Sequence, residues 1–215
     1  MMLLDWTVVA SLAVTLAVAL AGFLATYFNG LRLAQRKDRL DRVNRQLSEL
    51  YGPLLALVSA SSRSWEAFRS RYRTTTWSYW DPATPPTKEE EQAWRQWMRH
   101  VFMPLNERMM ELVVTKADLL ETPTMPDCLL RLAAHVAAYR AFIAQWDEGN
   151  FSQHKSIINF PPDLLDYATH TFAKLKEEQQ GLLGPQRSER SLPAFRRMPE
   201  GVRPPTTTTS TQRLD

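Results

Sequence analysis

Apolar residues fill the first part of the chain almost without interruption. The stretch from Trp6 to Phe28 contains no charged side chain. A helix of this length reaches about 35 Å, which is enough to cross a hydrocarbon core about 30 Å thick. The pattern therefore predicts one transmembrane helix over residues 6–28, with a short extracytoplasmic segment, 1–5, before it.

After this stretch the apolar residues recur at spacings of three and four, as on one face of a helix, without the sustained alternation typical of strands. Only 7 of the 215 residues are Gly. We therefore expect an all-α fold, in which the membrane helix continues into a basic stalk helix, 29–52, and then into an up-down bundle of four helices, 53–184. The polar stretch 185–215 has few large apolar residues and is predicted to be a disordered tail.

Particular residues mark the expected helix boundaries. Pro53 has no N–H, and its ring clashes with the carbonyl group four residues back, so we expect the helix to kink or restart there. Pro104 is expected to bend or restart a later helix for the same reason. Thr87 and Glu90 have the spacing of a capping box, in which each side chain accepts a hydrogen bond from the backbone N–H of the other residue. The next helix is expected over about 127–148.

Charge is distributed unevenly about the predicted span. Asp5 is the only charged residue before it, whereas the residues that follow include Arg32, Arg36, Lys37, Arg39, Arg42 and Arg45. Basic residues near a membrane helix stay on the cytoplasmic side, so we predict an inner (plasma) membrane protein with its N-terminus outside and the bulk of the chain in the cytosol. A cleaved signal peptide is the alternative, but it needs a basic segment before a shorter apolar core.

Four of these basic residues are candidates for contact with anionic lipid headgroups, namely Arg32, Arg36, Lys37 and Arg39. Such a contact contributes about 1 kcal/mol for each basic residue near the surface. Membrane topology alone is the alternative explanation for their presence.

Small residues recur at every fourth position within the predicted span, at Ala13, Ala17, Ala21 and Ala25. This spacing places them on one face of the helix, where small side chains let two membrane helices approach closely. We predict a seam for self-association or for docking of a partner helix. The alternative is that these alanines face lipid and have no partner.

The motifs of common catalytic and metal sites are missing from the sequence. None of the four histidines has a Glu three residues before it, as a di-iron bundle requires, and His-Glu-x-x-His and the Gly-rich phosphate-binding motifs are absent. Cys128 and His135 lie two helical turns, about 10.8 Å, apart, which is too far to share one metal ion. We expect Cys128 to be a small half-buried thiol and His135 to be a hydrogen-bonded core residue. No catalytic residue, metal or cofactor is predicted.

The connection 150–160 is long for a helical bundle, and long ordered loops are often functional. Three of its residues, His154, Lys155 and Ser156, could bind an anionic ligand or a partner. The interpretation that we favour is structural: Phe151, Ile157 and Phe160 would pack back onto the bundle, and their burial would stabilise it by several kcal/mol.

Aromatic residues cluster between positions 65 and 97. Trp65 and Trp94 are expected in the core, whereas Trp77 and Trp80 fall in a Thr- and Pro-rich loop and are candidates for protein docking, since Trp is frequent in interface hot spots. An interfacial membrane belt and a loop lid are the alternatives for these two residues.

These patterns favour an interaction protein over an enzyme. The leading hypothesis is a membrane-anchored cytosolic helical module, a homo-oligomer or an accessory subunit of a larger assembly. The alternative is a single-span sensor or effector whose bundle binds a small ligand and signals to or through the membrane. The net charge is +3, and 185–215 alone carries six Arg against three acidic residues. The folded part is thus balanced, and no nucleic-acid partner is expected.

Overall fold

The computed structural model describes residues 6–73 and 82–184. Within these residues every regular element is a helix, so the all-α prediction is confirmed. The predicted N-terminal segment 1–5 and the predicted disordered tail 185–215 lie outside the described residues.

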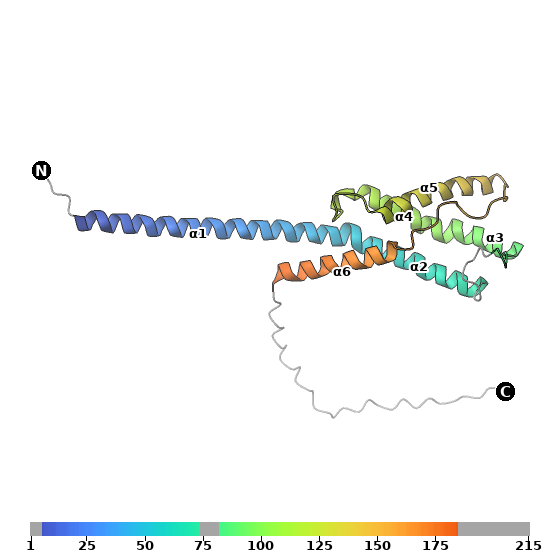
Figure 1. Ribbon diagram of the computed structural model, residues 1–215, viewed down its shortest axis with the longest axis horizontal. Coiled ribbons are helices and arrows are strands. Elements are labelled where there is room, and N and C mark those ends of the chain that lie inside the picture. The colour runs from blue at the N-terminus through green and yellow to red at the C-terminus, as the bar shows by residue number, and fades with distance from the viewer. Residues whose placement is uncertain (1–5, 74–81, 185–215) are drawn as a thin grey trace, which may run out of the picture. The chain divides into compact units, whose positions relative to one another are not determined.

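The first three elements form one continuous helix. Helix α1 (Trp6–Arg45) runs into a π-helical turn, η1 (Gln46–Tyr51), and directly on into α2 (Gly52–Tyr72) (Figure 1). The uninterrupted helix from Val8 to Tyr72 is 65 residues long. We expected a kink or a restart of the helix at Pro53, and the continuous helix excludes the restart.

The π-helical turn explains how the helix continues past Pro53. The N–H of Gly52 donates to the carbonyl of Leu47, five residues back, which widens the helix just before the proline ring. A wider turn relieves the clash that a proline ring otherwise makes with the carbonyl four residues back. The turn also needs a glycine, because a Cβ at position 52 would lie 2.5 Å from the Leu47 carbonyl oxygen.

The same arrangement recurs at Pro104. Helix α3 (Lys88–Trp97), the π-helical turn η2 (Met98–Phe102) and α4 (Met103–Thr115) follow one another without a gap, and the N–H of Met103 donates to the carbonyl of Met98. The predicted capping box is confirmed at the start of α3. Glu90 N–H donates to Thr87 Oγ1 over 3.2 Å, and Thr87 N–H donates to Glu90 Oε2 over 2.7 Å.

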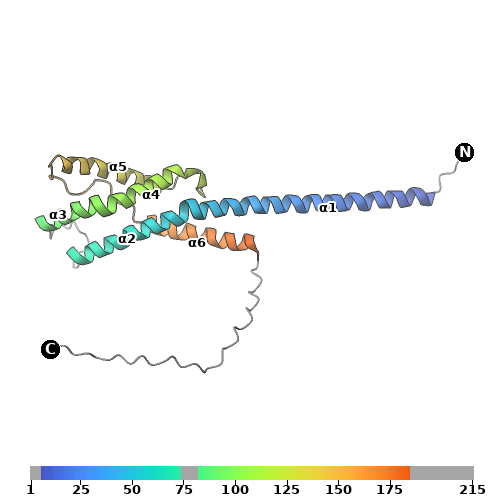
Figure 2. The same ribbon diagram turned by 180° about the vertical axis from the view of Figure 1, so that it is seen from behind.

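A short 3₁₀ turn, η3 (Ala117–Leu119), leads to α5 (Asp127–Asp147), and α6 (Leu164–Leu183) closes the bundle. The continuous helices α1–η1–α2 and α3–η2–α4, and then α5 and α6, run in alternating directions (Figures 1 and 2), with α2 in contact with both α4 and α6, and with α5 against α4. The core between them is filled by fully buried side chains from α2, α4, α5 and α6, including Leu54, Phe68, Met109, Leu132 and Leu164.

Helix α1 differs from the bundle helices because most of its apolar side chains are exposed. From Leu12 to Leu33 its large apolar residues are exposed, and the four alanines of the predicted seam are exposed as well. Such a helix is compatible with a single membrane span or with a signal sequence. Its last turns pack against α6, where Arg36 Nε donates to the carbonyl of Leu182 over 2.7 Å and Arg39 pairs with Glu178 at 2.6 Å.

Candidate ligand-binding cavity

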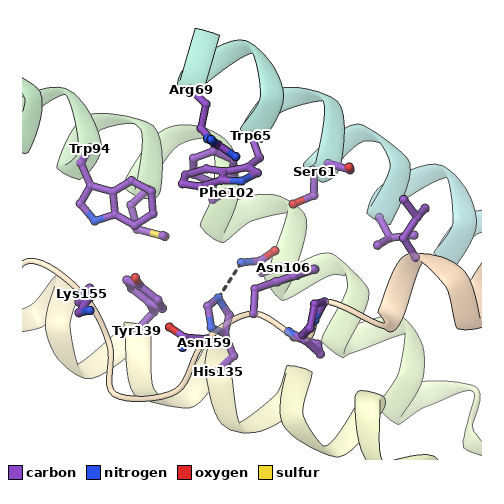
Figure 3. A pocket seen from close by; sticks show the side chains of 17 residues that line it. Ser61, Trp65, Arg69, Trp94, Phe102, Asn106, His135, Tyr139, Lys155 and Asn159 are labelled. Carbon is purple, nitrogen blue, oxygen red and sulfur yellow. Dashed lines mark hydrogen bonds between the residues drawn. The ribbon is translucent and has the colours of Figure 1, made fainter. Parts of the chain in front are cut away.

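A cavity of about 540 Å³ lies inside the bundle, away from α1. Its walls come from α2, from the continuous α3–η2–α4 helix, from α5, from the loop that precedes α6 and from the start of α6 (Figure 3). Cavities of this size are typical of sites for small molecules. The positions of its polar side chains therefore decide what it can hold.

Aromatic rings form one wall of the cavity. Trp65 from α2, Trp94 from α3 and Phe102 from η2 contact one another, with ring centroids about 6 Å apart: 5.9 Å from Trp65 to Trp94, 6.1 Å from Trp65 to Phe102 and 5.9 Å from Trp94 to Phe102. The indole N–H of Trp94 donates to the carbonyl of His154 over 2.7 Å, which ties this wall to the loop before α6. The π-helical turn at Pro104 supplies Phe102, so it helps to shape the cavity.

His135 is buried in α5, and its hydrogen bonds fix its tautomer. Its Nδ1 lies 2.8 Å from the carbonyl oxygen of Ile158, which can only accept, so Nδ1 carries the proton. Its Nε2 is then an acceptor, and it lies 3.3 Å from the side-chain nitrogen of Asn106. Burial lowers the pKa of His135, which favours the neutral ring that this arrangement requires. The prediction of a hydrogen-bonded core histidine is confirmed.

Asn106 is held in one orientation by this histidine. Because Nε2 of His135 accepts, the Asn106 group that faces it is the NH₂ group, and the amide oxygen turns to the other side, toward α2 (Figure 3). The Asn106 residue is only 2% exposed, and its Oδ1 is buried without a hydrogen-bond partner. The floor of the cavity, formed by Asn106, therefore holds an acceptor whose hydrogen-bonding capacity is unused, and a ligand donor reaches this covered oxygen after a small shift of its neighbours.

Tyr139 lies one turn after His135 and presents a second buried polar group to the cavity. Its ring packs against the His135 ring with centroids 4.8 Å apart. Burial raises the pKa of Tyr139 to about 12, although a hydrogen bond from the backbone of Ser156 acts in the opposite direction. The phenol is therefore neutral at physiological pH and can donate a hydrogen bond.

The charged side chains of the cavity are both cationic. Lys155 from the loop and Arg69 from α2 line it, and none of the lining residues that the structure describes is acidic. The cavity thus combines an apolar, aromatic wall, neutral hydrogen-bonding groups and positive charge.

The three predicted loop residues are separated by the fold. Lys155 lines the cavity, as a ligand-binding loop residue would. His154 lies beside it, with Nε2 3.2 Å from Glu91 and Nδ1 3.3 Å from Arg95. Ser156 is buried, and its Oγ accepts a hydrogen bond from the N–H of Ile158 over 3.1 Å, so it stabilises the loop itself.

The favoured structural interpretation of this loop is wrong for two of its three apolar residues. Phe160 packs against the core, but Ile157 is 87% exposed and Phe151 is 47% exposed. Phe151 instead lies under the guanidinium group of Arg95, whose carbon is 4.6 Å from the ring centroid. The loop is held mainly by hydrogen bonds to its backbone, of which those from Trp94, Trp146 and His135 are the clearest.

The structure places the predicted lipid-binding residues and Cys128 in different environments. Of the lipid-binding candidates, Arg36 and Arg39 bind α6, whereas the described contacts leave Arg32 and Lys37 exposed on α1. Trp77 and Trp80 lie outside the described residues. Cys128 is buried rather than half-buried, and burial raises the pKa of its thiol. Across residues 6–73 and 82–184, no three potential metal ligands lie close enough together to hold an ion.

Sequence reasoning missed Asn106, the residue that sets the polarity of the cavity. The signal was present, because Asn106 falls on the same helical face as Phe102, Met109 and Val113, all of which are buried. A polar residue in an apolar stripe is unusual and needs a partner.

Comparison of the chain with protein-family models, with curated proteins and with solved structures found no match.

Proposed function

We propose that this chain is a single-span membrane protein whose helical bundle binds a small, water-soluble ligand and acts as a sensor or effector. The observation that carries the proposal is the buried, unpaired Oδ1 of Asn106 at the floor of the aromatic-walled cavity. Leaving a buried acceptor unpaired costs about 1–3 kcal/mol, which a bound group with an N–H or O–H would recover.

The length of the first helix supports a ligand from water rather than from the bilayer. Phe28 ends the apolar stretch, and Ser61 is among the first cavity residues on the same continuous helix. The separation of 33 positions corresponds to about 50 Å of helix. At a tilt of about 40° the cavity still stands roughly 40 Å beyond the end of the span.

The same helix offers a direct route for a signal. Trp65 and Arg69 line the cavity, and the helix that carries them continues without a break through η1 into α1. A ligand that shifts α2 would therefore move the apolar segment as well. On this proposal the apolar segment is retained as the span, with the N-terminus outside and the bundle in the cytosol.

The test is binding to the full-length protein in mild detergent, with a variant that fills the cavity. Ser62 lines the cavity, and Ser70 is exposed two turns later on the same helix. We expect a metabolite screen by thermal shift to yield compounds that stabilise wild type and S70F but not S62F. Compounds that act equally on S62F, or a screen without any stabilising compound, would count against a ligand-binding bundle.

A second proposal is a membrane-anchored interaction module, a scaffold or an accessory subunit, and the exposed alanine face of α1 favours it. Small residues on one face of a membrane helix permit close helix packing. Cross-linking in native membranes, followed by sizing in detergent, tests it: Ala17→Leu and Ala21→Leu should disrupt the oligomer or the complex, whereas Val18→Leu should not. A wild-type protein that is strictly monomeric and brings no partner with it would remove this second proposal.

A further inference from the structure

The charge of the cavity walls restricts the ligand. Lys155 and Arg69 are its only charged lining residues among those described, and both are cations. Lys155 attracts an anion and repels a cation, and no acidic side chain is among the described residues that line the cavity. Lys155 is exposed at the cavity edge, so it can follow an anionic group without loss of packing.

The shape and chemistry of the walls restrict the body of the ligand. Trp65, Trp94 and Phe102 present ring surfaces on one side (Figure 3). Phe160 from the loop and Leu165 from α6 add apolar surface. Aromatic walls of this kind favour a flat, apolar group, which can pack face to face or edge to face with the rings.

The direction of hydrogen bonding at the floor is fixed. Asn106 cannot turn its NH₂ group to the cavity while Nε2 of His135 accepts from it, and His135 cannot release Nε2 while its Nδ1 proton is held by the Ile158 carbonyl. The cavity floor therefore accepts a hydrogen bond at Oδ1 and does not donate one there. A ligand that reaches the floor gains from an N–H or O–H and loses from a carbonyl.

We propose that the ligand is a small organic anion with a flat, apolar body, a carboxylate or phosphate near Lys155, and an N–H or O–H donor directed at Asn106. This inference rests on the proposed ligand-binding function and adds the chemical class. The anionic group and the donor lie at different ends of the body, because Lys155 and Asn106 come from different walls of the cavity (Figure 3).

Matched probes separate these features. Indole-3-acetate has the anion and the donor, 1-methylindole-3-acetate lacks the donor, indole-3-acetamide lacks the anion, and tryptamine replaces the anion with a cation. The same four types can be assembled on phenol and naphthol bodies. Affinities are measured by titration NMR on the full-length protein in detergent, with S62F to identify binding in the cavity. We expect the probe with anion and donor to bind at least about 10-fold more tightly than its partners on the body that fits best.

Two variants assign the preference to residues. Asn106→Leu keeps the size of the side chain but removes the acceptor, so the donor and methylated probes should bind equally. Lys155→Gln should reduce the preference for the anion by several fold, and Lys37→Gln, an exposed lysine on α1, is the matched control.

The outcomes distinguish the inference from the function on which it rests. If amides, amines or probes without a donor bind as well as the donor-bearing anion, and S62F abolishes their binding, the cavity is a ligand site but its assigned chemistry is wrong. If no probe of any type shows binding that S62F removes, the ligand-binding function fails together with the inference.

Discussion

Two clusters of buried polar side chains lie in the bundle, and they differ in whether their hydrogen bonds are complete. In the first cluster, the hydroxyl group of Tyr51 lies 3.2 Å from that of Tyr167 and accepts a hydrogen bond from the N–H of Glu121 over 3.1 Å. The side chain of Gln46 donates a hydrogen bond to the carbonyl of Leu119 over 3.0 Å. In the second, Asn106 and His135 bond to each other, but the Asn106 oxygen has no partner.

The difference follows from what surrounds each cluster. Around Tyr51 the core is filled by Leu50 and Leu54, so every polar atom must find its partner within the chain. Asn106 borders a cavity, where a partner can come from outside. A closed cluster stabilises the fold, whereas an open one beside a cavity indicates a binding site. Four predictions test this comparison.

The largest effect is expected from a cavity made in the filled region. Leu54 is completely buried in α2 beside Tyr51, and Leu54→Ala should lower the free energy of unfolding by about 2–5 kcal/mol. Denaturant unfolding of the detergent-solubilised protein measures it, with Leu57→Ala, a partly buried neighbour, as the control. A loss below about 1 kcal/mol would mean that the core around Tyr51 is not well packed.

The next effect concerns the π-helical turn that carries Tyr51. Gly52→Ala should destabilise the protein by about 1–3 kcal/mol, because the new Cβ would lie 2.5 Å from the Leu47 carbonyl oxygen. Helix propensity alone predicts the opposite sign, a gain of up to about 1 kcal/mol. Gly181→Ala in α6, where the structure leaves open space, should show that gain. Equal gains at both positions would contradict the π-helical turn.

The helix around Gly52 and Pro53 also shows how far the sequence could predict the fold. The apolar stretch 6–28, the capping box at Thr87 and the helix over 127–148 depend on neighbours in the chain, and the structure confirms the helix in each case. Continuity through Pro53 depends on a widened turn packed against α6, which no local pattern reveals. Pro53 was therefore expected to kink or restart the helix, whereas the helix continues through it.

The cavity was less predictable than the fold for a related reason. Lys155 was named as a candidate, but its neighbours His154 and Ser156 face elsewhere. Asn106 and His135 are 29 residues apart and meet only because α4 packs on α5. Ile157 was expected to be buried because it is apolar, but apolar character alone does not predict the direction in which a loop side chain points.

A direct test of the comparison removes one polar group from each cluster. Tyr51→Phe deletes the acceptor of the Glu121 N–H and should lower stability by about 1–3 kcal/mol. Asn106→Leu also breaks a hydrogen bond, to His135, but it removes the unpaired oxygen, so the net change should stay within about 1 kcal/mol. Thermal and denaturant unfolding of both variants measure the difference. A larger loss for Asn106→Leu would show that its oxygen has a structural partner.

The smallest effect is a pH dependence that arises in the open cluster. The pKa of His135 is lowered in the folded state by burial, against an ordinary value of about 6.5. The unfolded chain therefore binds more protons as the pH falls through about 6.5, and stability decreases on acidification until His135 is also protonated in the folded protein. Between pH 7.5 and 5 the free energy of unfolding should fall less steeply in His135→Gln than in wild type. His170→Gln, on the exposed side of α6, should keep the wild-type slope. A His135→Gln variant with the full wild-type slope would mean that His135 is not held neutral in the fold, and the fixed orientation of Asn106 would lose its basis.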